Sequence, residues 1–171
     1  MSPEPVAERP WIPPDYKGSD PESTIATTLR SWADTRSRLA DARTYWVVSA
    51  GTDGWPLARP FWGLWLDDSF VFATQPSTRT ARNLEANPRM QIHLEDGEDV
   101  VTADGRAERV DQADYLGPWL AKYAALGARL PADDEPVERV AFRMRPRKAF
   151  GWTLAAFPGD LTRWRFSGSR D

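Results

Sequence analysis

The chain has 171 residues, of which 41% are hydrophobic and 27% charged, a composition typical of a single globular domain. Its net charge of −3, without a long basic run, argues against binding to nucleic acid or to an anionic membrane surface. The absence of cysteine excludes disulfides, thiolate nucleophiles and cysteine-ligated metal centres.

The first part of the chain predicts an extended arm followed by a helix. Residues 1–18 are rich in proline, which favours an extended segment outside the core. They lack the basic start and apolar run of a signal peptide, and no stretch suits a membrane span, so we expect a cytoplasmic protein. Residues 19–171 are expected to form one domain. It opens with Ser19-Asp20-Pro21-Glu22, a typical helix start, and apolar residues at helical spacing carry that helix to Leu39.

Residues 44–74 predict three antiparallel strands joined by short turns. Residues 45–50 are aromatic and β-branched, and Asp53-Gly54 after them is typical of a tight hairpin. A second strand is expected over about 57–66 and a third over 70–74. Turns this short exclude βαβ units, because a parallel pair needs a long crossover connection.

The second half of the chain continues the antiparallel pattern. A short helix is predicted over 79–86, ending before Pro88, and alternation over 90–94 predicts a half-buried strand. A long strand follows over 99–110, with Gly105 as a bulge or bend, then a helix over 112–126. Two last strands are expected over 139–145 and 148–154. The total is six or seven antiparallel strands, which most economically close into a mainly β barrel with flanking helices.

The segment from Pro76 to Leu84 combines three kinds of group that bind anions. A helix start offers free N–H groups and the positive end of the helix dipole. Hydroxyls and guanidinium groups surround it, and guanidinium suits phosphate because it donates two hydrogen bonds at once. The alternative is an ordinary capped surface helix with solvated arginines. The side chains concerned are those of Ser77, Thr78, Arg79, Thr80 and Arg82, with Arg59 as a candidate from an earlier strand.

Aromatic residues follow Arg59 along its strand. Phe61 and Trp65 share one face of that strand and Trp62 lies on the other, so both faces need cover. A second subunit or a flat ring system would provide that cover, and ordinary core packing is the alternative. Elsewhere the lone His93 has no partner for a metal, and the chain carries neither a catalytic serine triad nor a glycine-rich nucleotide motif.

The order of these segments resembles the pyridoxamine 5′-phosphate oxidase-like superfamily. The similarity runs from about Thr44 to Val110 and more weakly to Leu154. The family's Ser-Arg-Lys phosphate segment is similar to Thr78-Arg79-Thr80, and its following helix and Asn-Pro-Arg are similar to Ala81 through Arg89. Its cofactor-contacting strand arginine is similar to Arg59. The resemblance implies a homodimer of split β-barrels with one cofactor in each interface groove.

Differences from the oxidases point to one branch of that superfamily. Leu64 stands where they carry a second phosphate-binding lysine, Thr80 replaces the lysine of Ser-Arg-Lys, and their C-terminal segment is missing. The run from Arg59 to Trp62 and the segments 98–101 and 105–108 are more similar to the actinobacterial branch that uses the deazaflavin coenzyme F420. The resemblance therefore implies an F420-dependent oxidoreductase acting on a conjugated small molecule. FMN is the alternative cofactor, and a non-catalytic flavin carrier is a second alternative.

The resemblance also implies a set of cofactor-binding residues, without a catalytic acid or base and without a metal site. Trp152 is expected to reach the groove from the second subunit. The set comprises Arg59, Pro60, Phe61, Trp62, Thr74, Ser77, Thr78, Arg79, Thr80, Asn83 and Trp152.

Overall fold

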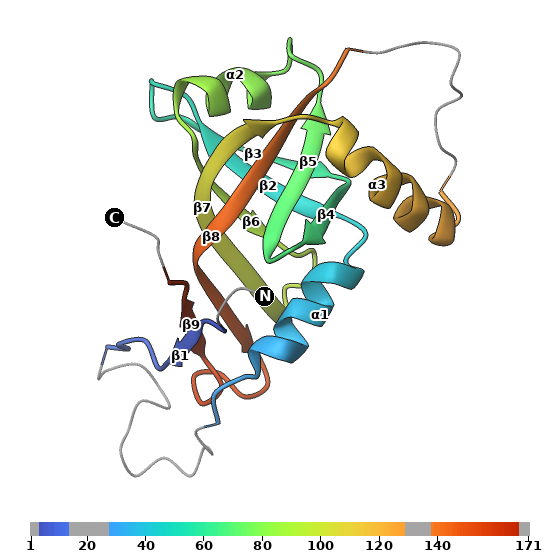
Figure 1. Ribbon diagram of the computed structural model, residues 1–171. Coiled ribbons are helices and arrows are strands. Elements are labelled where there is room, and N and C mark those ends of the chain that lie inside the picture. Colours follow the sequence, from blue (N-terminus) through green and yellow to red (C-terminus); the bar gives the residue numbers. More distant parts are fainter. Residues whose placement is uncertain (1–3, 14–27, 129–137, 168–171) are drawn as a thin grey trace.

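The computed structural model describes residues 4–13, 28–128 and 138–167, and one long antiparallel pair of strands dominates it. β7 (Asp99–Val110) pairs with β8 (Val140–Thr153) over its whole length, and both cross the molecule diagonally in Figure 1. Near one end of β8, β9 (Thr162–Arg165) pairs with it and in turn with β1 (Val6–Glu8). Near the other end, β5 (Ser69–Thr74) takes the same edge.

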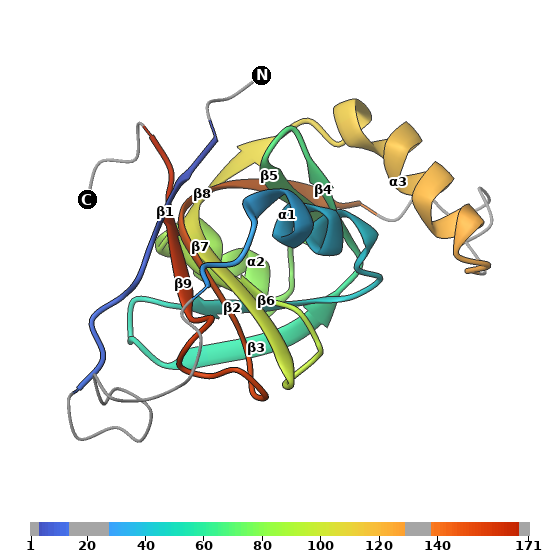
Figure 2. The same ribbon diagram turned by 90° about the horizontal axis from the view of Figure 1, so that it is seen from below.

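The remaining strands extend the sheet on both sides of this pair. β6 (Arg89–His93), β2 (Tyr45–Ala50) and β3 (Pro56–Phe61) follow β7 in that order, while β4 (Gly63–Leu66) forms a hairpin with β5. Every ladder is antiparallel, and Figure 2 shows the strands curled around the interior. The mainly β antiparallel prediction is confirmed, but nine strands are present among the described residues, so the expected six or seven is wrong.

The expected strand over 57–66 is two strands, because the chain changes neighbours at Trp62. Up to Phe61 it pairs with β2, and from Gly63 it pairs with β5. An ideal Cβ on Gly63 would lie 2.5 Å from a ring carbon of Phe70, so only glycine fits at this crossing. No ladder joins β3 to β4 in the described parts of the chain, and the expected closed barrel is therefore an open, curled sheet.

The two strands expected over 139–145 and 148–154 form one continuous strand, β8. Pro146 has no N–H to donate, but it pairs with Gly105, where the register of β7 shifts. An ideal Cβ on Gly105 would lie 2.3 Å from the carbonyl oxygen of Arg145, so a side chain there would force the two strands apart. The register shift at Gly105 confirms an irregularity at the predicted position, but the extra residue of the bulge is Arg147 of β8, because Asp104 pairs with Lys148 and Gly105 pairs with Pro146.

Three helices accompany the sheet among the described residues. α1 (Trp32–Asp41) lies over one end of the sheet and α2 (Arg79–Ala86) over the other, while α3 (Ala113–Ala125) packs beside β4 (Figures 1 and 2). Trp32 and Leu39 of α1 belong to the hydrophobic core between the strands. The helices expected over 79–86 and 112–126 are confirmed.

The start of the first helix differs from the expectation. Ser31 caps α1, its hydroxyl accepting from the N–H of Asp34 at 3.4 Å, and residues 28–30 are not helical. The N–H of Arg30 instead donates to the hydroxyl of Thr162 at 2.8 Å, which ties the preceding segment to β9. The predicted start at residues 19–22 lies outside the described residues. Of the expected arm, residues 6–8 form β1, and residues 1–3 and 14–18 likewise lie outside the description.

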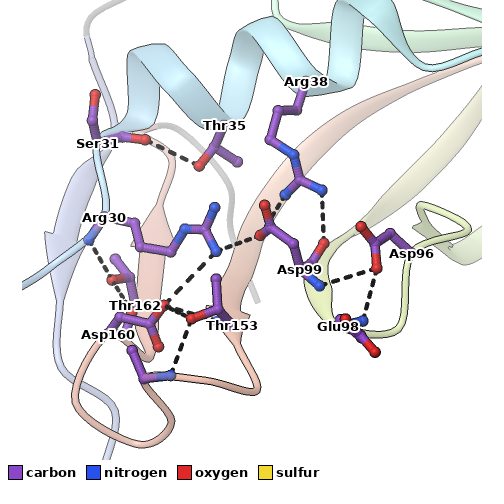
Figure 3. A network of polar contacts seen from close by, with 11 residues as sticks. Arg30, Ser31, Thr35, Arg38, Asp96, Glu98, Asp99, Thr153, Asp160 and Thr162 are labelled. Carbon is purple, nitrogen blue, oxygen red and sulfur yellow. Dashed lines mark hydrogen bonds and ion pairs between the residues drawn. The ribbon is translucent and has the colours of Figure 1, made fainter.

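A polar network connects α1 to the end of the long strand pair (Figure 3). Asp99, at the start of β7, accepts hydrogen bonds from Arg30 at 2.5 Å and from Arg38 at 2.7 Å, and Arg38 also donates to the Asp99 carbonyl oxygen at 2.7 Å. Asp160 accepts from the N–H and hydroxyl of Thr153, both at 2.8 Å. The Asp99 carboxylate thus links α1, the residues before α1 and the start of β7.

Candidate functional site

The start of α2 presents unused hydrogen-bond donors. Thr78 is the N-cap, and its hydroxyl accepts from the N–H of Ala81 at 3.2 Å while donating to the carbonyl oxygen of Gln75 at 2.9 Å. The hydroxyl of Thr74, at the end of β5, lies 3.2 Å from that of Thr78. The N–H groups of Arg79 and Thr80 find no acceptor in the parts of the chain that the structure describes. They remain available to an anion, with the helix dipole behind them.

Arg79 extends from this helix start toward the β2–β3 turn. Its Nη2 lies 3.8 Å from Oδ2 of Asp53, and both side chains are about half exposed or more. The turn has the expected geometry, since Gly54 has a φ of +74° and its N–H donates to the carbonyl oxygen of Gly51 at 3.1 Å. The predicted hairpin turn and the predicted helix start therefore meet at one corner of the molecule.

Arg59 lies on the face of β3 that is turned toward α2. It is opposite Val47 in the ladder, and paired residues project from the same face of a sheet. Ser49, two residues along β2 on that face, accepts a hydrogen bond from the amide of Asn83 in α2 at 3.3 Å. The guanidinium of Arg59 is exposed and donates to the carbonyl oxygen of its neighbour Ala58 at 3.1 Å.

Asn83 and Thr80 are buried beneath the helix start. The amide of Asn83 ties α2 to Ser49, and an ideal Cβ on Gly51 would lie 3.0 Å from Asn83 Oδ1, so a side chain at Gly51 would crowd the Asn83 amide. Both side chains are more than 90% buried, with exposures of 6% for Asn83 and 3% for Thr80. Asn83 therefore holds the helix against β2, a role that the sequence did not indicate. Ser77 is exposed in the turn before the helix.

The aromatic candidates are divided among different parts of the structure. Phe61 packs against Phe72 at the edge of the core, with ring centroids 4.8 Å apart. Trp62 stacks on Tyr123 of α3, with centroids 4.6 Å apart, and this contact leaves its ring facing away from the core. Pro60 is exposed on the opposite face of β3 from Arg59.

Trp152 lies at the other end of the sheet from α2. It pairs with Val100 near the start of β7, where the network of Figure 3 attaches α1. Its ring packs edge-on against Phe157 at 6.3 Å. A single chain therefore gathers Thr74, Ser77, Thr78, Arg79, Thr80 and Asn83 at the α2 start, carries Arg59 on the same face of the sheet, and places Trp152 elsewhere.

Sequence reasoning did not anticipate a partly buried ammonium group, that of Lys122, where α3 meets the sheet. The ammonium group of Lys122 donates to the carbonyl oxygens of Ala42 at 2.7 Å and Gly63 at 3.2 Å, and to the hydroxyl of Tyr45 at 3.1 Å. It also lies 5.0 Å from the ring centroid of Tyr45. Burial lowers the pKa of Lys122 to about 8. The only sequence signal for a partly buried Lys122 is its position on α3, three residues after Trp119 and next to Tyr123.

The hydroxyl of Tyr123 completes this cluster by capping a break in the sheet. It accepts from the N–H of Gly63 at 2.7 Å and lies 2.7 Å from the carbonyl oxygen of Arg43. Burial raises the pKa of Tyr123 to about 12 and raises the pKa of Tyr45 as well. The cluster holds α3 against Gly63, where β3 ends and β4 begins.

The shifted pKa values predict how the free energy of unfolding depends on pH. Between pH 8 and 10.5 the unfolded chain keeps the proton that folded Lys122 has lost, so stability rises with pH. Above pH 10 unfolded tyrosines ionise while Tyr45 and Tyr123 stay protonated in the fold, so stability falls. Urea unfolding at several pH values should show a maximum near pH 10. Lys122→Met should abolish the rise above pH 8, while Lys148→Met, at a lysine on β8 that is 36% exposed and pairs with Asp104, should keep it.

Comparison with known proteins places this geometry in a family. The family model described as pyridoxamine 5′-phosphate oxidase matches residues 32–153, which include every strand from β2 to β8. The chain belongs to the pyridoxamine 5′-phosphate oxidase family. The resemblance inferred from the order of strands, phosphate segment and short helix is thereby confirmed. No curated protein matches the chain significantly.

Solved structures share the family fold at low sequence identity. A conserved hypothetical protein from Mycobacterium tuberculosis is 24% identical, with a TM-score of 0.62 and coverage of 75% of this chain and 88% of that one. An F420 reductase is 21% identical, with a TM-score of 0.56 and coverage of 66% and 94%. PhzG from Burkholderia lata 383, in complex with tetrahydrophenazine-1-carboxylic acid, is 19% identical, with a TM-score of 0.54 and coverage of 81% and 84%.

Two negative findings apply to the described residues. They contain no group of three or more histidine, cysteine, aspartate or glutamate side chains that could hold a metal ion. None of their helices is long and apolar enough to cross a membrane.

His93 stacks on Trp46, with ring centroids 5.9 Å apart, and its Nδ1 lies 3.0 Å from the carbonyl oxygen of Leu94.

Proposed function

We propose that the protein is an oxidoreductase that binds coenzyme F420 at the start of α2 and reduces a conjugated small molecule. The observation that carries this proposal is the convergence of three kinds of donor at one corner. The free N–H groups of Arg79 and Thr80, the exposed Ser77 and the guanidinium of Arg79 lie there, and Arg59 is on the same face of the sheet. The F420 reductase among the similar folds supports the choice of cofactor.

The groups at this corner fit an anionic tail. Free N–H groups at a helix start bind phosphate without any further charge, and guanidinium adds paired hydrogen bonds. The buried tie between Asn83 and Ser49 holds the helix start in place against the sheet. Preorganised donors of this kind bind a ligand without the loss of entropy that ordering them would otherwise require.

In this proposal the chain supplies binding, orientation and a dry groove. When bound, F420 supplies the hydride chemistry. Arg79 and the α2 start hold the phosphate, and Arg59 flanks it from β3. Phe61 rests on Phe72, so its position is rigid enough to line the groove beside Arg59.

We also propose that the protein works as a homodimer. Pro60 and Ala58 of β3 are exposed on the outer face of the sheet beside Trp46 and Val48 of β2, and together they form an apolar strip. A second subunit would cover this strip and would bring its Trp152 to the groove, which one chain does not do. Sedimentation of the purified protein should give the mass of two chains.

Titration of the purified protein with both cofactors tests the function. We expect no bound flavin after purification and tight binding of added F420. Binding is measured as a change in the absorption spectrum of F420 during the titration. Absorption near ~450 nm with FMN fluorescence would instead support an FMN protein. Failure to bind either cofactor would contradict the proposal and leave the family fold without a ligand.

A further inference from the structure

Asp53, in the β2–β3 turn, places a carboxylate against the first turn of α2. Its Oδ2 lies 3.8 Å from Arg79 Nη2, and its Oδ1 accepts from the N–H of Trp55 at 3.1 Å. An ideal Cβ on Gly51 would lie 3.2 Å from Asp53 Oδ1 and 3.0 Å from Asn83 Oδ1. The carboxylate therefore shares the corner in which the proposed phosphate-binding groups meet.

The negative charge of Asp53 has no evident role in folding. The turn uses one oxygen as an acceptor, which an asparagine would supply equally well. The pair with Arg79 is long, and the two side chains are 48% and 65% exposed, so it contributes little to stability. A charge in this position acts mainly on whatever anion enters the corner.

The positive charge available to that anion is limited. Thr80 and Leu64, at the two positions where the related oxidases carry lysines, are neutral and buried. Arg79 and Arg82 of α2 and Arg59 of β3 remain, and Asp53 offsets one of them. These residues thus offer about two positive charges plus the helix dipole, which amounts to about half a charge, and without Asp53 they would offer one more.

We propose that Asp53 determines which phosphate the site accepts, by disfavouring a terminal phosphate monoester and tolerating a phosphodiester. A monoester carries a charge of about −1.5 to −2 at pH 7, whereas a diester carries one negative charge. FMN ends in a monoester, and the phosphate of F420 is a diester. This inference rests on the proposed function and adds to it a residue that selects between the two cofactors.

The test compares the affinities of F420 and FMN for the full-length protein and for Asp53→Asn. Asparagine keeps the acceptor for Trp55 and removes only the charge. We expect the ratio of the FMN to the F420 dissociation constant to fall by about fivefold in this variant, because the dianion gains more from the lost repulsion. Asp67→Asn, in the exposed β4–β5 turn, changes the net charge equally and should leave the ratio unchanged. Asp53→Glu should keep the wild-type ratio.

Two further readouts separate this effect from a change in structure. The effect should shrink at high ionic strength, since these charges are exposed. FMN binding to Asp53→Asn should strengthen as the phosphate loses its second proton near pH ~6, and this gain should be smaller in the wild type.

The outcomes distinguish the inference from the proposed function. If the wild type binds F420 and Asp53→Asn shifts the ratio no more than Asp67→Asn does, the role of Asp53 is refuted and the proposed function stands. Equal wild-type affinity for FMN and F420 would also refute it. If the wild type binds neither cofactor, both proposals fail.

Discussion

Arg79→Ala should weaken F420 binding at least tenfold. A charge-assisted hydrogen bond to phosphate contributes about 1.5–3 kcal/mol, and about 1.4 kcal/mol corresponds to a factor of ten. The substitution also leaves Asp53, now 3.8 Å from the Arg79 guanidinium, as an unpaired negative charge beside the bound anion. Isothermal titration of the purified variant with F420 measures the loss.

Two variants separate the role of this guanidinium from general charge effects. Arg109→Ala removes the same charge from an exposed side chain that pairs with Glu85 at the far end of α2, and its affinity should stay within twofold of wild type. Arg79→Lys keeps the charge without the planar fork and should show an intermediate loss. Equal affinities for Arg79→Ala and wild type would mean that the α2 start is only a capped helix.

Asp99→Ala should lower the free energy of unfolding by about 2 kcal/mol, the largest effect on stability expected here. It removes the acceptor for Arg30 and Arg38, whose side chains are 15% and 28% exposed. Arg38 then loses its carboxylate partner, and Arg30 keeps only the long contact with Asp160 at 3.9 Å (Figure 3). The value lies between the small cost at an exposed pair and the 3–5 kcal/mol typical of a fully buried one. For a chain of this size it corresponds to a fall of about 4–8 °C in Tm.

A neighbouring arginine on the same helix provides the control. Arg36 is 54% exposed and lies 3.9 Å from its nearest carboxylate, that of Asp68, so Arg36→Ala should change stability by less than about 0.5 kcal/mol. Arg38→Ala should cost more than Arg36→Ala. The double variant Asp99→Ala, Arg38→Ala should show that the two effects are not additive. Additive effects would mean that α1 is held by its apolar face alone.

Elements that depend on neighbouring residues were predictable from the sequence. The helix from Arg79 to Ala86 and the strand from Asp99 to Val110 have the expected limits, because caps, prolines and alternating hydrophobic residues act over a few positions. The turn at Asp53-Gly54 follows from the positive φ that glycine readily adopts. The turn and the α2 start were each predictable because local residues determine them, but their meeting at one corner was not predicted.

Features that depend on distant partners were not predictable. β1 has three residues and exists because it pairs with β9, more than 150 positions away, where Arg163 donates to Glu8 at 2.6 Å. After Trp62 the chain pairs with β5 instead of β2, and this is possible because Gly63 has no side chain to clash with the ring of Phe70. No local sequence pattern indicates this contact. The same holds for Trp62 itself, whose stacking on Tyr123 requires α3 to fold back onto β4.

The chain's residues alone therefore specify the antiparallel class, the two well-bounded elements α2 and β7, and the hydroxyl and guanidinium groups at the α2 start that we propose bind an anion, since each rests on short-range propensity and on the chemistry of adjacent side chains. Packing in three dimensions settles which strands become neighbours, that the sheet stays open among the described residues, and that Asp53 faces Arg79. These outcomes depend on pairings between remote segments, whose energy arises only when the whole sheet is assembled.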